Sequence, residues 1–114
     1  MPSLAERFSE YRVMWLMVFF DMPTETKAQR KAYADFRKKL LVDGFTMFQF
    51  SLYIRHCPSW ESAEVHRKRV QAIIPQWGMI GVLCVTDKQF AKMEIYRGVK
   101  RPQAPPPTMQ LELF

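Results

Sequence analysis

The stretch Val13-Met-Trp-Leu-Met-Val-Phe-Phe20, followed by Asp21-Met22-Pro23-Thr24, decides the fold of this chain. An eight-residue apolar run that contains valine and aromatic residues and stops before a proline is typical of a strand buried on both faces. We therefore expect the first strand to span residues 11–20, with Asp21 at its carboxyl end. A carboxylate held there by a rigid element can offer oxygen ligands to a hard cation such as Mg²⁺. Asp21 is thus the candidate metal ligand and catalytic residue, and capping of the following loop or helix is its alternative role.

The first helix follows this strand and has two contrasting faces. Thr26 and Gln29 have the spacing of a capping box, and Asp43-Gly44 supplies an end signal, so the helix is expected to run to about Val42. One arc of about 140° is apolar and can pack on a sheet. The opposite arc, about 120° wide, contains basic residues and no acid. We call this set the basic stripe; it comprises Lys27, Arg30, Lys31, Arg37 and Lys38.

Further along the chain the hydrophobic period changes several times. Residues 46–55 alternate, which indicates one long half-buried strand or two strands around a kink. A second helix is expected between Pro58-Ser59 and Pro75, followed by a buried strand over residues 79–86. Residues 90–96 alternate again and predict an outer strand.

This order of elements fits an α+β, ferredoxin-like β-α-β-β-α-β sandwich with an extra C-terminal edge strand. We divide the chain into a leader (1–10), the ferredoxin-like domain (11–98) and a proline-rich C-terminal tail (99–114). Two helices on one sheet face leave the other face uncovered, and a second copy could cover it, so we expect a homodimer. We assign to that open face the mixed set Gln49, Ser51, Tyr53 and Arg55; an ordinary amphipathic outer face is the alternative.

Composition points to a polyanionic partner. The 114 residues include 17 Lys and Arg against 11 Asp and Glu, for a net charge of +6. A second basic group near the predicted outer strand includes Lys92 and Arg97, although either group could be a solvated surface. No apolar run approaches the roughly 20 residues of a membrane helix and no signal-peptide pattern is present, so we expect a cytoplasmic protein without membrane contact. Cys57 and Cys84 are read as small buried thiols, and His66 as a packed histidine.

The ordered set Phe19-Phe20-Asp21-Met22-Pro23-Thr24, Arg30-Lys31-Ala32-Tyr33, Phe36-Arg37-Lys38, Gly44-Phe45 and Gln49-Phe50-Ser51-Leu52-Tyr53 resembles the small CRISPR-associated family called Cas-two. The resemblance spans most of residues 11–97. It implies a ferredoxin-like homodimer that takes part in spacer acquisition, bridging the Cas-one integrase and holding duplex DNA. Members of the family are described as Mg²⁺-dependent endonucleases on RNA or DNA, and Asp21 matches their metal-binding aspartate. The tail, with Leu111, Leu113 and Phe114, resembles an extension that contacts the integrase in some relatives.

Two functions follow as hypotheses: a DNA-binding scaffold for the integrase, and a magnesium-dependent endonuclease. A ribonuclease toxin-like enzyme that acts without the integrase is a third possibility. The endonuclease hypothesis meets a physical difficulty, because two-metal phosphodiester hydrolysis needs several carboxylates close together. Asp87 is expected at the opposite rim of the sheet from Asp21. A symmetric pair of Asp21 side chains from two subunits is the remaining route to a metal site.

Overall fold

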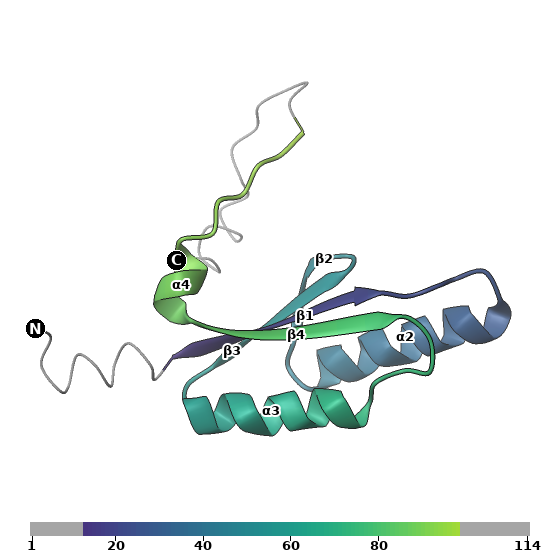
Figure 1. Cartoon of the computed structure of the whole chain (residues 1–114), viewed down its shortest axis with the longest axis horizontal. Coiled ribbons are helices and arrows are strands. Elements are labelled where there is room, and N and C mark those ends of the chain that lie inside the picture. The colour runs from purple at the N-terminus through teal and green to yellow at the C-terminus, as the bar shows by residue number, and fades with distance from the viewer. Residues whose placement is uncertain (1–12, 99–114) are drawn as a thin grey trace, which may run out of the picture.

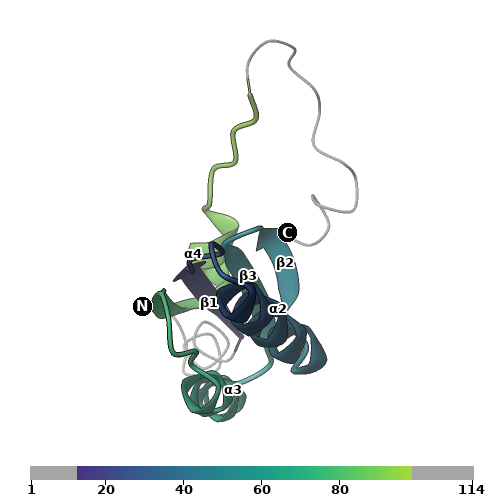
Figure 2. The ribbon, with the colours of Figure 1, turned by 90° about the vertical axis from the view of Figure 1, so that its right-hand side faces the viewer.

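The structure is a computed structural model, and it describes residues 13–98. The first strand, β1, spans Met14–Asp21 and lies inside a four-stranded antiparallel sheet of order β2-β3-β1-β4. The two long helices lie together on one side of that sheet, and Figures 1 and 2 show a short helix, α4, on its other side. The remaining elements, in chain order, are α2 (Lys27–Val42), β2 (Thr46–Gln49), β3 (Leu52–Cys57), α3 (Trp60–Ala72), β4 (Met79–Thr86) and α4 (Asp87–Ala91).

This arrangement confirms the predicted α+β, ferredoxin-like fold. Residues 46–57 form two strands around the turn Phe50-Ser51, which settles the choice between one strand and two. The capping box of α2 is present, since Thr26 Oγ1 accepts the Gln29 N–H and Gln29 Oε1 accepts the Thr26 N–H, both at 3.1 Å. Gly44, with a φ of +91°, ends the helix in the left-handed region that glycine adopts without strain.

The principal core lies between the sheet and helices α2 and α3. Phe20 lies at its centre, with the rings of Phe36 and Tyr53 each 5.4 Å away. Tyr53 is fully buried there, and Arg55 on the same strand donates to the Asp43 carbonyl at the end of α2, so our assignment of Tyr53 and Arg55 to the uncovered face was wrong. The Tyr53 hydroxyl accepts a 2.6 Å hydrogen bond from Arg37 Nε, which makes burial of this polar atom compatible with the core.

The predicted outer strand at residues 90–96 is also wrong. Residues 87–91 form helix α4, and residues 93–98 have no regular secondary structure. Thr86 and Gln89 build a second capping box, and this local hydrogen bonding favours a helical turn over extended chain. Phe90 is thereby placed against the face of the sheet opposite α2 and α3, where it packs with Met17, Leu52 and Ile54.

Strand β4 has the predicted bounds but is less buried than expected, because it is an edge strand. Leu83 is 49% exposed and Met79 is 78% exposed. Together with Phe19 on the neighbouring strand, Leu83 and Met79 belong to the side of the sheet that carries Phe90, as their pairing register shows. This side, which we call the open sheet face, is therefore only partly covered within residues 13–98. No helix of this described part is long and apolar enough to cross a membrane.

Candidate nucleic-acid interface

Asp21 ends β1 at an exposed rim of the sheet, as predicted. It pairs with Met79 across the β1–β4 ladder, and the residue before Met79 is Gly78, with a φ of +95°. A Cβ atom at position 78 would lie 2.5 Å from the Asp21 carbonyl oxygen, so the close approach of the chain here requires glycine. Asp87 donates its N–H to the Val13 carbonyl at 2.9 Å, at the far end of the same ladder. The expectation that the two acids lie at opposite rims is confirmed.

The predicted metal ligand, Asp21, is not part of a larger group of metal-binding side chains in the described residues. Within residues 13–98, no three His, Cys, Asp or Glu side chains are placed to share a metal ion. Mg²⁺ is usually held by one or two carboxylates plus waters and substrate phosphates, in near-octahedral geometry. A Mg²⁺ ion at Asp21 would therefore depend on waters and substrate phosphates, or on a carboxylate from a second subunit, for its other ligands.

The basic stripe lies on the solvent side of α2. All five of its residues are exposed, while Phe36 and Leu40 on the other side of the helix are buried. Two stripe residues are also fixed by the fold. The Arg30 guanidinium donates to the carbonyls of Thr24 and Glu25, at 3.2 and 3.0 Å, and Arg37 donates to the Tyr53 hydroxyl. The ion pairs found across the described residues involve Asp43 and Glu64, and none includes a residue of the stripe.

The second basic group does not extend this stripe. Lys92 caps the end of α4 and Arg97 lies in the segment after it, on the other side of the sheet from α2. Both side chains are exposed. The structure thus presents the two predicted basic groups in separate regions. The predicted contact residues Leu111, Leu113 and Phe114 lie outside the described residues.

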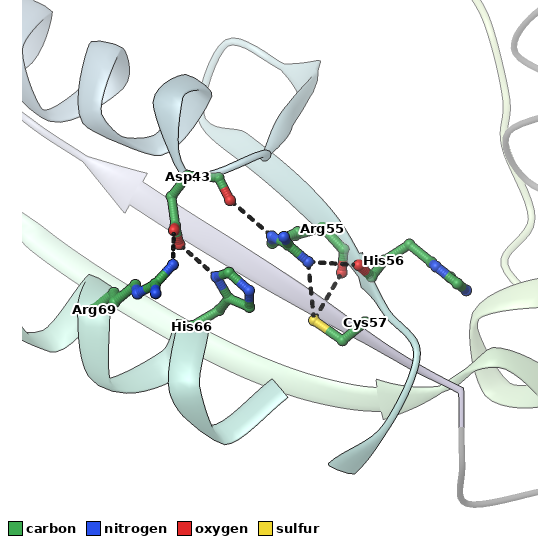
Figure 3. Close-up of polar contacts among 6 residues, drawn as sticks. All are labelled: Asp43, Arg55, His56, Cys57, His66 and Arg69. Atoms are coloured by element: carbon green, nitrogen blue, oxygen red, sulfur yellow. Dashed lines mark hydrogen bonds and ion pairs between the residues drawn. The ribbon is translucent and has the colours of Figure 1, made fainter. Parts of the chain in front are cut away.

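A polar cluster joins the end of α2 to α3 (Figure 3). Asp43 accepts hydrogen bonds from His66 at 2.8 Å and from Arg69 at 2.9 Å. Arg55 reaches the same point from β3 and donates to the Asp43 carbonyl at 2.7 Å. Burial alone would raise the pKa of Asp43, but the hydrogen bonds and positive charge of its partners outweigh it, and the pKa is lowered. His66 is buried and paired, which confirms the prediction of a packed histidine.

The cluster contains cysteine, histidine and aspartate, but it lacks a usable nucleophile. Cys57 is fully buried, and burial raises the pKa of its thiol, which disfavours the reactive thiolate. His56 points away from the other side chains in Figure 3 and packs its ring against Trp15, with centroids 5.0 Å apart. We therefore assign this cluster a structural role, which is to hold α2 against α3.

The sequence analysis did not single out Asp43 or Phe50 as functional or structural positions. Asp43 was read only as part of a helix end, and its link to His66 joins residues 23 positions apart. Phe50 was assigned to an alternating strand, whereas it lies in the turn between β2 and β3 and is 78% exposed. A large apolar side chain at a turn is the signal that could have singled it out, since turns favour small and polar residues.

Comparison with known proteins assigns the family. The sequence model of the family "CRISPR associated protein Cas2" matches residues 14–93. Similar proteins include "CRISPR-associated endoribonuclease Cas2" of Flavobacterium psychrophilum, 56% identical over 108 residues that cover 95% of this chain and 94% of the relative. Proteins of the same name from Parvibaculum lavamentivorans (52% identity, 89% of this chain, all of the relative) and Ligilactobacillus salivarius (42%, 76% and 86%) also match. The chain belongs to this family, and the resemblance to Cas-two is confirmed.

Proposed function

We propose that this member of the Cas-two family is a homodimer that binds duplex DNA and presents it to the Cas-one integrase during spacer acquisition. The observation that carries the proposal is the basic stripe of α2. Its five exposed cations extend over about three turns of a rigid helix, and none is paired with a carboxylate in residues 13–98. Such a row suits the regularly spaced phosphates of a duplex and binds its backbone without reading its sequence.

The open sheet face supports the dimer. Phe19, Leu83 and Met79 expose apolar surface there, beside the partly buried cluster around Phe90. A second copy of the chain could cover this surface and would leave α2, on the opposite side of the sheet, accessible to DNA. The molar mass in solution tests whether the protein is a dimer. A monomer at working concentrations would contradict this part of the proposal.

Charge reversal tests DNA binding. Lys31 and Lys38 are the best targets because no hydrogen bond fixes their side chains, unlike those of Arg30 and Arg37. We expect the double variant Lys31→Glu/Lys38→Glu to abolish spacer acquisition in cells that supply the integrase. The control is Lys39→Glu/Lys68→Glu, which changes the net charge equally at exposed positions outside the stripe. Normal acquisition by the first variant, or equal loss in both, would refute the role of the stripe.

The integrase contact is proposed for the C-terminal tail. Four of the chain's eight prolines lie in residues 102–107 and precede an alternating apolar segment with Leu111, Leu113 and Phe114. Removal of residues 102–114 should end capture of the integrase in a pull-down and leave binding of DNA by the stripe intact. Undiminished capture by the truncated chain would assign the contact to another surface.

Magnesium-dependent endonuclease activity is the second candidate. Its support is the name endoribonuclease carried by the relatives, together with the exposed position of Asp21 at the end of β1. A site with two carboxylates would form if the Asp21 side chains of two subunits met at the dimer axis. Purified wild type and Asp21→Asn should then differ in Mg²⁺-dependent cleavage of RNA and DNA. Equal cleavage by both would attribute the activity to a contaminant, and acquisition by Asp21→Asn is expected to remain normal.

A further inference from the structure

Phe50 is an exposed aromatic residue at the same rim as Asp21. It occupies the turn between β2 and β3, and its side chain is 78% exposed. The Phe20 N–H donates to the Ser51 carbonyl at 3.0 Å, so Asp21 and Phe50 each adjoin one member of that hydrogen-bonded pair. An exposed phenyl ring at a turn does not contribute to the core, which raises the question of what it contacts.

The turn that carries Phe50 is held from two sides. Strand β1 holds it through the Phe20–Ser51 hydrogen bond, and α2 holds it through the Tyr33 hydroxyl, which donates to the Phe50 carbonyl at 3.2 Å. Tyr33 itself packs edge-on against Phe20, with ring centroids 5.9 Å apart. The backbone at position 50 is therefore fixed, so that the ring can be presented to a ligand at a lower entropic cost than a ring on a free loop.

Helix α2 contacts this turn through Tyr33, which lies between two cations of the basic stripe in the sequence. Arg30, Tyr33 and Arg37 have the spacing i, i+3 and i+7, so they share the side of α2 that faces the β2–β3 hairpin. Tyr33 contacts the turn directly and Arg37 contacts Tyr53 three residues beyond Phe50. The backbone of Phe50 therefore lies beside the part of α2 that carries Arg30 and Arg37.

We propose that Phe50 is a stacking platform for an unpaired nucleobase, next to the phosphate-binding stripe. Sites that bind single-stranded nucleic acid usually combine cationic side chains with aromatic rings on which bases stack. Inside a duplex both faces of each base are covered by neighbouring bases, so a protruding phenyl ring can stack only on a terminal or unpaired base. The proposal rests on nucleic-acid binding by the stripe and adds a ligand preference: DNA with single-stranded ends should bind better than a blunt duplex.

The test compares a duplex that carries single-stranded ends with a blunt duplex of the same length, by fluorescence anisotropy on the full chain. For Phe50→Ala we expect about tenfold weaker binding of the first DNA and a smaller change for the blunt one, in which only the outer faces of the terminal bases are open. Phe50→Leu should behave like Phe50→Ala, whereas Phe50→Trp should restore binding, because stacking needs a ring. Trp60→Ala is the matched control: it removes another exposed aromatic side chain, 52% exposed, at the start of α3.

A fluorescent base analogue in the single-stranded end gives an independent readout, since stacking on Phe50 quenches its emission and Phe50→Ala should abolish the quenching. Equal binding of both DNAs by wild type and Phe50→Ala would overturn the proposal and leave the role of the stripe standing. Failure of wild type to bind either DNA would overturn both. A dimer lost in Phe50→Ala, detected by light scattering, would assign the ring to the subunit contact instead and also overturn it.

Discussion

Helices α2 and α3 lie on the same face of the sheet and both carry several cations, but only α3 neutralises most of its charge within the fold. In α3, Arg67 pairs with Glu64 at 3.0 Å and Arg69 pairs with Asp43 at 2.9 Å. In α2, no residue of the basic stripe is paired with a carboxylate within the described residues. The number of basic residues therefore does not identify a binding surface, whereas the partners of those residues do.

The largest expected effect concerns the α3 side. Asp43→Ala should lower the free energy of unfolding by about 1–3 kcal/mol, because it leaves the buried His66 without its hydrogen-bond partner. Most of this cost belongs to His66, since the Arg69 side chain is 60% exposed and its ion pair is screened by solvent. Urea unfolding measures the change, and Asp35→Ala on the exposed side of α2 is the control. An unchanged unfolding midpoint would show that the cluster does not hold α2 against α3.

Neutralisation of the stripe should have the next largest effect, on binding and not on stability. Lys31→Gln/Lys38→Gln is expected to weaken binding of duplex DNA about tenfold and to reduce the salt dependence, because fewer counterions are released. The free energy of unfolding should change by less than about 0.5 kcal/mol, as for most surface substitutions. Titrations with duplex DNA at several salt concentrations measure the slope, which is the change in log binding constant with log salt concentration. If Lys39→Gln/Lys68→Gln gave the same slope change, the distinction between the stripe and the other surface lysines would be lost.

A smaller effect is expected from pH. The pKa of Asp43 is lower in the folded protein than in the unfolded chain, so protonation of this carboxyl favours unfolding. Its contribution to stability is complete above the ordinary aspartate value of about 3.9 and is lost as the pH falls through the lower, folded value. Stability curves of wild type and Asp43→Asn should therefore converge at the acid end. Parallel curves down to the lowest pH would exclude Asp43 as the source of the acid sensitivity.

The smallest effect is expected at the exposed pair of α3. Arg67→Gln breaks the ion pair with Glu64, and we expect no measurable change in the unfolding midpoint or in DNA binding, because both side chains are well solvated. Thermal unfolding and the anisotropy titration check this. A clear loss of DNA affinity in Arg67→Gln would extend the binding surface from α2 to α3 and break the contrast between the two helices.

Sequence reasoning worked where the signal was local. The apolar run that ends at Asp21, the capping box of Thr26 and Gln29, and the glycine after Asp43 all predicted features that the structure contains. The same kind of local signal was missed at the end of β4, where Thr86 and Gln89 repeat the spacing of Thr26 and Gln29. The alternation of residues 90–96 was preferred there, although a capped turn supplies hydrogen bonds that an isolated outer strand lacks.

Prediction failed where the outcome depended on packing across the sheet. The two alternating sets of residues 46–55 both contain aromatic rings, so their pattern did not show which set faces the helices. The bulge between Met47 and Gln49 and the turn at Phe50 also interrupt the alternation on which the assignment was based. Burial of Tyr53 became favourable only because Arg37, from a different element, satisfies its hydroxyl.

The sequence by itself determined the order of the strands and long helices, the position of Asp21 at the end of β1 and the row of cations along α2, because periodicity and capping act between residues a few positions apart. Only the tertiary structure decided which sheet face is covered, which cations are paired and where Phe50 is exposed. These properties depend on contacts such as Asp43 with His66 and Tyr33 with Phe50, whose partners are 23 and 17 residues apart. No local pattern encodes such contacts, since they form only when the helices pack on the sheet.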